Sequence, residues 1–177
     1  MTKQECIEYV KSRGGIETKD GWNVLKSVDL SHKNLTEIPI KFNIVQGSFY
    51  CQFNKLTSLK NSPKIVQCVN NVQCINNFKG KFWCFNNHLS SLKNCPKIVG
   101  GEFFCFHNQL TSLKYCPKEI KDNFYCFGNK LTSYKYSPKE LQGEYYCDKG
   151  NFKGKDYYKF LLDEKIIKKE EYLLRIL

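Results

Sequence analysis

Cysteine and histidine are the side chains in this sequence that could act as nucleophiles, general bases or metal ligands. The chain has ten cysteines and three histidines among its 177 residues. Cys84 and Cys105 each have a histidine nearby in the sequence, His88 and His107, and a thiol beside an imidazole is the arrangement of a cysteine nucleophile. Closely spaced cysteines and histidines would instead indicate zinc. Both kinds of chemistry require thiols that reach solvent or one another.

The spacing of the cysteines argues against both. Cys84, Cys105, Cys126 and Cys147 are each 21 residues apart, and an aromatic residue stands two places before each of them: Phe82, Phe103, Phe124 and Tyr145. Alternation along a strand places both members of Phe-x-Cys on one side, and apolar burial raises a thiol pKa. No repeat cysteine belongs to a C-x-x-C pair, and no phosphate loop, H-E-x-x-H or nucleophile elbow occurs. We therefore expect internal thiols, no metal, no cofactor and no catalysis.

The other positions of the repeat recur in register with the cysteine. Asn87, Asn108 and Asn129 follow it by three residues, and Leu89, Leu110, Leu131 and Phe152 follow it by five. The frame extends upstream through Phe49, Cys51, Asn54, Leu56, Leu59 and Pro63, and through Val28, Leu30, Leu35 and Ile38. Each unit is expected to form one short strand, a turn and an irregular return, with the asparagine bonding backbone groups at the turn. Stacked units bury what one unit cannot.

One segment departs from this frame. Cys74 and Asn77 match the cysteine and asparagine positions, but Cys74 lies 23 residues after Cys51 and only ten before Cys84. A parallel strand needs a return of about a dozen residues or more, so the stretch from Val66 to Lys81 cannot form a complete coil. It is either a trimmed turn or an inserted loop.

These residues carry a resemblance to a known family. The frame F-x-C-x-x-N-x-L-T-S-L, as in Phe49 to Leu59, resembles the leucine-rich repeat, and the segment from Val28 to Pro39 resembles it most. The version with Pro-Lys and Gly before the next strand, from Pro96 to Cys105, is similar to short repeat proteins of bacteriophages and large DNA viruses. The resemblance covers about Trp22 to Phe152. It implies a β-rich solenoid with parallel strands on a concave face, and a protein from a phage or virus.

The two ends of the chain have the pattern of helical caps for such a solenoid. Thr2 and Glu5 have the spacing of a capping box, and Gly14-Gly15 would end the helix. Apolar residues at helical spacing follow the repeats, at Tyr157, Phe160 and Leu161, and a second short helix is expected to include Ile166, Ile167, Leu173, Leu174 and Ile176. The predicted organisation is a helical cap over residues 1–21, the solenoid over 22–152 with an irregular unit at 66–81, and a helical cap over 153–177.

The side chains beside the cysteine are predicted to form two outward columns. Adjacent strands lie about 4.8 Å apart, so the residues directly before and after each cysteine stack along the concave face. Exposed apolar patches commonly mark binding surfaces, although cross-strand aromatic pairs also stabilise sheets. Gln52, Gln73, Ile75 and Asp148 occupy the other column positions. With Glu102 and His107 as polar neighbours, the predicted partner-binding residues are Tyr50, Trp83, Phe85, Glu102, Phe104, Phe106, His107, Tyr125, Phe127 and Tyr146.

Lysines form a second periodic feature, away from the strands. The formal charge is +11, which suggests an acidic partner or an anionic surface, or else a lysine-rich surface that keeps the solenoid soluble. Two ladders could bind anions such as a phosphate backbone; they are Lys60, Lys93, Lys114 and Lys135, and Lys64, Lys97, Lys118 and Lys139. Arginine, the main reader of bases, occurs only at positions 13 and 175, so any nucleic-acid binding would be non-specific.

The sequence thus favours a non-catalytic module that binds a protein through its aromatic face. The formal charge of +11 favours an acidic partner. By the resemblance to phage and viral repeat proteins, that partner would be a host factor, such as a defence or regulatory protein, that is inhibited or modulated. A polyanion binder using the lysine ladders, and a structural component that assembles with itself, are the alternatives. No apolar run is long enough to span a bilayer, and residues 1–10 lack the pattern of a secretory signal, so we expect the cytoplasm, that of the host for a phage or virus.

Overall fold

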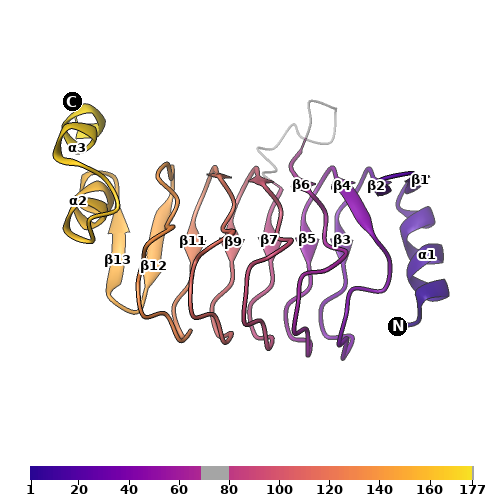
Figure 1. The fold of residues 1–177 in the computed structure, drawn as a ribbon. Helices are drawn as coiled ribbons and strands as arrows, with labels where there is room; N and C mark the ends of the chain where they lie inside the picture. Colours follow the sequence, from indigo (N-terminus) through magenta and orange to yellow (C-terminus); the bar gives the residue numbers. More distant parts are fainter. Residues whose placement is uncertain (69–79, 177) are drawn as a thin grey trace.

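A computed structural model describes residues 1–68 and 80–176 and shows a β-solenoid, as the repeat predicts. The coils follow one another in sequence order, with a helix beside the first and two helices beside the last (Figure 1). The elements are α1 (Lys3–Ser12), β1 (Ile16–Thr18), β2 (Gly21–Val24), β3 (Val28–Asp29), β4 (Phe42–Val45), β5 (Phe49–Tyr50), β6 (Ile65–Val66), β7 (Phe82–Trp83), β8 (Ile98–Val99), β9 (Phe103–Phe104), β10 (Glu119–Ile120), β11 (Phe124–Tyr125), β12 (Glu144–Cys147), β13 (Gly150–Lys153), α2 (Lys155–Asp163) and α3 (Lys169–Ile176).

Each coil contributes to two sheets. Within the described residues, one sheet has the order β13-β12-β11-β9-β7-β5-β3 and carries the Phe-x-Cys strands, and we call it the aromatic sheet. The other, with the order β1-β2-β4-β6-β8-β10, is the return sheet. Neighbouring strands are parallel except in the hairpins β12–β13 and β1–β2 at the two ends. The irregular return expected from the sequence is therefore partly regular: the apolar pairs after Pro-Lys, such as Ile98-Val99, form strands whose inward members are buried.

The irregular segment is an insertion between two neighbouring coils. β5 pairs directly with β7, which places Phe49 opposite Phe82, and β6 pairs directly with β8. Cys51 and Cys84 thus occupy neighbouring coils although they are 33 residues apart, twelve more than the usual 21. This pairing favours the inserted-loop interpretation over the trimmed turn. The predicted positions Gln73, Cys74, Ile75 and Asn77 lie outside the described residues.

The Phe-x-Cys side chains form internal columns, as predicted. Phe49, Phe82, Phe103 and Phe124 are fully buried, and their rings follow one another at centroid distances of 5.3–5.7 Å. The thiols of Cys51, Cys84, Cys105 and Cys126 are also fully buried and free, and burial raises the pKa of each. Removing one such phenylalanine side chain from water stabilises the fold by about 1.5–3 kcal/mol. Cys68, outside these columns and half-buried, is disulfide-bonded, whereas reduced thiols are expected for a cytosolic chain.

The asparagine ladder joins each coil to the one before it. The Oδ1 atom of Asn108 accepts from the backbone N–H of Leu89 at 3.0 Å, while its Nδ2 atom donates to the carbonyls of Cys84 and Cys105 at 3.0 and 3.1 Å. Asn54, Asn87 and Asn129 make equivalent bonds. The predicted structural role of these side chains is confirmed.

Helices cover both ends of the solenoid. In α1, Thr2 and Glu5 form the predicted capping box, Cys6 and Val10 are buried, and the Tyr9 hydroxyl accepts from the backbone N–H of Asp29 on the edge strand β3 at 2.9 Å. At the other end, α2 buries Tyr157, Phe160 and Leu161 against the last hairpin. The helices thus cover the end coils, whose edge strands would otherwise present unpaired backbone groups to other chains. None of the described helices has the length and apolar composition needed to cross a bilayer.

Candidate functional site

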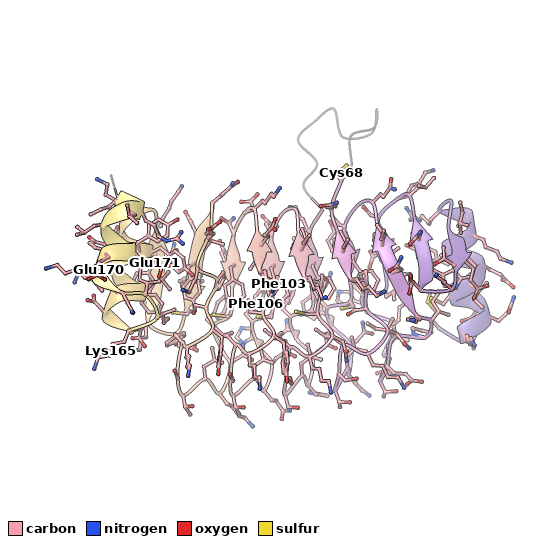
Figure 2. The ribbon with its side chains drawn as sticks, turned by 45° about the horizontal axis from the view of Figure 1, so that its top comes forward. Cys68, Phe103, Phe106, Lys165, Glu170 and Glu171 are labelled. Carbon is pink, nitrogen blue, oxygen red and sulfur yellow. The ribbon has the colours of Figure 1, made fainter. Side chains whose placement is uncertain are left out.

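The outward side chains of the aromatic sheet form a continuous surface of rings, which we call the aromatic face. Its members are half-buried, apart from the more exposed Tyr146, and they lie in two columns: Tyr50, Trp83, Phe104, Tyr125 and Tyr146, and Phe85, Phe106 and Phe127. Successive rings are 4.3–5.6 Å apart between centroids within the columns. Rings of the two columns are 6.0–6.5 Å apart across each strand. Phe106 lies among the central coils, in the same coil as the buried Phe103 (Figure 2).

The inner rings of the aromatic face stack along the solenoid at interplanar angles of 6–13°, so their edges rather than their flat faces turn toward solvent. The ring planes of Trp83 and Phe104 are nearly parallel, with an angle of 6° between them, and the planes of Phe106 and Phe127 also differ by 6°. Because these stacks run along the solenoid, neighbouring rings cover one another's flat faces. Tyr146 closes both columns with edge contacts to Tyr125 and Phe127 at 5.6 and 5.0 Å. The surface is therefore lined by ring edges, which carry the positive part of the aromatic quadrupole.

Charged groups border the face where its strands begin. Glu102 Oε2 lies 3.0 Å from Lys81 Nζ, an ion pair without hydrogen-bond geometry, and this ammonium lies 5.3 Å from the ring centroid of Trp83. Burial raises the pKa of Tyr125, and the carboxylates of Glu144 and Glu102 add to the shift. The structure thus places Glu102 beside the rings, as the sequence suggests, but already paired with a cation.

His107 borders the face on the opposite side, where the strands end. Its ring contacts Phe106 and Phe127 at centroid distances of 5.4 and 5.2 Å. Phe53, at the same repeat position, is absent from the sequence prediction: it is 44% exposed and extends the second column by contacting Phe85 at 5.2 Å. This position has a positive φ in successive coils, including 54° at Phe53 and 49° at His107. Gly128 at the same position was the available signal that the chain turns sharply there.

Two polar atoms at the start of the face have no hydrogen-bond partner among the described residues. They are the indole Nε1 of Trp83 and the side-chain carbonyl oxygen of Gln52, both buried. Gln52 occupies the second column in the coil before Phe85. A buried polar group without a partner costs about 1–3 kcal/mol, so these two atoms reduce the stability of the fold.

The thiols and imidazoles considered for catalysis lie in different environments. Cys84 and Cys105 are fully buried, whereas His88 and His107 are exposed. Burial is the largest cause of the raised pKa of both thiols. Among the described residues, no group of three or more cysteine, histidine, aspartate or glutamate side chains is placed to hold a metal ion.

The eight lysines of the predicted ladders are all exposed, along the turns that lead to the return sheet. Backbone hydrogen bonds hold the lysines of successive coils in register. The N–H of Lys97 donates to the carbonyl of Lys64 at 2.9 Å, and the N–H of Lys118 donates to the carbonyl of Lys97 at 3.0 Å. Among the described residues, exposed ion pairs occupy only the ends of this row, from Lys64 to Asp20 at 3.5 Å and from Lys139 to Glu171 at 3.4 Å. We call the eight lysines and the turns that carry them the lysine edge.

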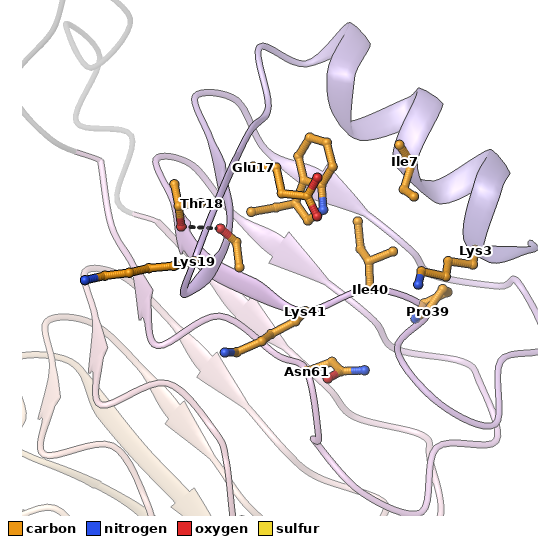
Figure 3. A pocket seen from close by; sticks show the side chains of 11 residues that line it. Lys3, Ile7, Glu17, Thr18, Lys19, Pro39, Ile40, Lys41 and Asn61 are labelled. Atoms are coloured by element: carbon orange, nitrogen blue, oxygen red, sulfur yellow. Dashed lines mark hydrogen bonds between the residues drawn. The ribbon is translucent and has the colours of Figure 1, made fainter.

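Two hollows continue the lysine edge toward the N-terminal end. One is lined by Lys41, Lys60, Lys64 and Lys97, together with Asn61 and Asn94. The other shares Lys41 and Asn61 with it and lies between α1 and the first coils, where Lys3 and Lys19 also line it (Figure 3). Glu17 adds one acidic group there, and the Thr18 hydroxyl donates to the carbonyl of Gly21 at 2.6 Å. Cationic side chains therefore border this side of the molecule over most of its length.

Comparison with known proteins adds no relative to this description. No protein-family model, curated protein or solved structure matches the chain. The aromatic face and the lysine edge are thus the features from which a function can be inferred.

Proposed function

We propose that this chain is a binding module that holds a protein partner on its aromatic face. The observation that carries the proposal is the continuous double column of half-exposed rings on one side of the sheet. The internal phenylalanine columns already supply a core, and apolar surfaces of this extent on soluble domains commonly serve recognition. Tryptophan and tyrosine, which provide the first column, are enriched among the residues that dominate binding energy.

The orientation of the rings defines the chemistry of the partner. Nucleobases and sugar rings stack on open aromatic faces, but here neighbouring rings cover those faces. Ring edges are complementary to carbonyl and carboxylate oxygens and to aliphatic groups, all of which a protein surface offers. The formal charge of +11 would steer an acidic partner toward the module.

We further propose that the partner is a host defence or regulatory protein in the cytoplasm, which the module inhibits or modulates by covering its surface. The repeat frame supports this setting, because its Cys-containing form with Pro-Lys resembles short repeat proteins of phages and large DNA viruses. The proposal requires no catalytic group in the chain.

The test compares partner capture by three forms of the full-length chain. The double variant Trp83→Ala/Phe104→Ala removes two central rings, and Ile65→Ala/Ile98→Ala removes two half-buried side chains from the return sheet as a matched control. We expect the wild type and the control to retain one host protein that the ring variant loses. With the purified partner, the ring variant should bind about 30-fold more weakly or worse, the loss typical of a binding hot spot.

All three forms must unfold cooperatively for the comparison to hold. If the ring variant, while folded, binds the purified partner as tightly as the wild type, the aromatic face is not the binding surface. Light scattering on the free wild-type chain gives a second readout. A concentration-dependent dimer that Trp83→Ala/Phe104→Ala abolishes would replace the proposed partner with a second copy of the chain.

A further inference from the structure

Two tyrosines on the lysine edge occupy backbone positions that disfavour them. The turn after the asparagine ladder reads Lys-Asn-Ser-Pro-Lys at residues 60–64 and Lys-Asn-Cys-Pro-Lys at residues 93–97, but tyrosine replaces asparagine at Tyr115 and Tyr136. The second residue of this turn has a φ of 69–76° in all four coils. Asparagine tolerates this left-handed conformation, whereas a bulky side chain there is unusual. Folding alone therefore gives no reason for the change to tyrosine.

The two rings also stand apart from the packed interior. Tyr115 is 52% exposed and Tyr136 is 48% exposed. Neither ring contacts another aromatic ring of the described chain, in contrast to the stacked rings of the aromatic face. The ammonium of the preceding lysine lies over each ring, Lys114 at 5.2 Å from the centroid of Tyr115 and Lys135 at 5.3 Å from that of Tyr136. About half of the surface of each tyrosine is open to solvent.

The backbone beneath the rings is firmly held. The Cys95 thiol donates to the carbonyl of Tyr115 at 2.8 Å, and next to Tyr136 the Ser137 hydroxyl donates to the carbonyl of Tyr134 at 2.8 Å. The Tyr157 hydroxyl also donates to the carbonyl of Pro138. A fixed turn that presents an aromatic ring between two lysines is a preorganised platform, with one cation before the ring and one three residues after it.

We propose that the lysine edge binds single-stranded nucleic acid, with Tyr115 and Tyr136 as stacking platforms for bases. Lys114, Lys118, Lys135 and Lys139 flank the two rings and lie where the phosphates of such a strand would pass. Exposed rings interleaved with cations are the arrangement by which proteins hold single strands without reading their sequence. Lysine supplies point charges for phosphate and little base specificity, which suits a sequence-independent site. An acidic peptide would use the same charges but has no need of the rings.

The test measures the binding of a labelled oligothymidylate of about twenty nucleotides to the full-length chain by fluorescence anisotropy at low salt. In Tyr115→Asn/Tyr136→Asn, each tyrosine is replaced by the residue found at this position in the other coils, so the variant should be at least as stable as the wild type. We expect its affinity to fall about tenfold or more, because stacking contributes a factor of about five or more per base. Tyr115→Phe/Tyr136→Phe keeps the rings and should bind like the wild type.

Two further arms identify the ligand and the surface. Lys114→Gln/Lys135→Gln should reduce the dependence of log affinity on log salt by about 0.7 for each phosphate that the variant no longer neutralises. Trp83→Ala/Phe104→Ala should bind the oligonucleotide normally, which separates this site from the aromatic face. Unchanged affinity in Tyr115→Asn/Tyr136→Asn would overturn the proposal. So would absence of binding at low salt, or stronger binding of polyglutamate than of oligothymidylate.

Discussion

At the scale of single residues, the buried thiols give the fold a dependence on pH. The thiols of Cys51, Cys84, Cys95, Cys105, Cys116 and Cys126 all have a pKa raised above the ordinary 9.0, with burial as the largest cause. The pKa of Cys6 in α1 is raised to about 11, also by burial. In the unfolded chain these groups lose their protons near their ordinary pKa, while in the folded chain they keep them. The folded state therefore loses relative stability as pH rises above 9.

We accordingly predict that the free energy of unfolding is constant with pH up to about 8.5 and falls above about 9. Each thiol contributes a slope of up to about 1.4 kcal/mol per pH unit. Urea titrations followed by circular dichroism, at pH values from about 8.5 to about 10.5, measure how steeply the free energy of unfolding falls. Cys105→Ala serves as the control, because it lacks one thiol and should show a shallower fall. A stability that stays level to about pH 10.5 would contradict the burial of these groups.

The rings that we propose as binding residues differ in how far the sequence reveals them. The aromatic face follows from the alternation of side chains along a strand. Because the phenylalanine and cysteine of Phe-x-Cys point inward, the residues beside the cysteine point outward, and most residues of the face could be named in advance. Phe53 and Tyr115 could not, because their positions depend on the sign of φ in a turn, which a hydrophobic pattern does not encode. A weak signal existed: asparagine at 61 and 94 and glycine at 128 occupy the equivalent positions in other coils.

At the scale of elements, segments with the same residue types in every coil are predictable, and segments whose residue types vary between coils are not. The capping box at Thr2 and Glu5 identifies α1, and the 21-residue register identifies the aromatic sheet. The return sheet is harder to predict because its strands do not repeat one residue type. The pair is Ile65–Val66 and Ile98–Val99 in two coils but Glu119–Ile120 in a third. What makes them strands is the neighbouring coil, which the repeat places in register. Close stacking also explains Gly143, where an added Cβ would lie 2.5 Å from the backbone nitrogen of Asn123 in the preceding coil.

The asparagine ladder is the element-scale contact most open to a test. Asn108→Ala removes an acceptor for the N–H of Leu89 and a donor to the carbonyls of Cys84 and Cys105, all buried. We predict a loss of about 2–4 kcal/mol in the free energy of unfolding, because these groups stay buried without partners. Asn151→Ala, which removes an exposed bond to Glu144, should change stability by less than about 0.5 kcal/mol. Urea denaturation measures both, and equal effects would show that the ladder does not hold the coils together.

At the scale of the whole molecule, one repeat produces two surfaces of different chemistry. The strand side of each coil adds rings to the aromatic face, and the turn after the asparagine adds lysines to the lysine edge. Both surfaces lengthen with every coil, and the helices at the ends close the array (Figure 1). We propose that the aromatic face holds a protein while the lysine edge binds an anionic strand. The formal charge of +11 favours both an acidic protein and such a strand.

Whether Trp83 becomes buried in the complex decides whether the aromatic face is the binding surface. The chain has two tryptophans, and Trp22 is only 5% exposed, so the Trp22→Phe variant leaves the half-buried Trp83 as the sole indole reporter. Acrylamide quenching of this variant is measured with and without a saturating amount of the captured partner. We expect the partner to shield Trp83 and to lower its quenching to that of a buried indole. Quenching that is unchanged in the saturated complex would contradict this expectation.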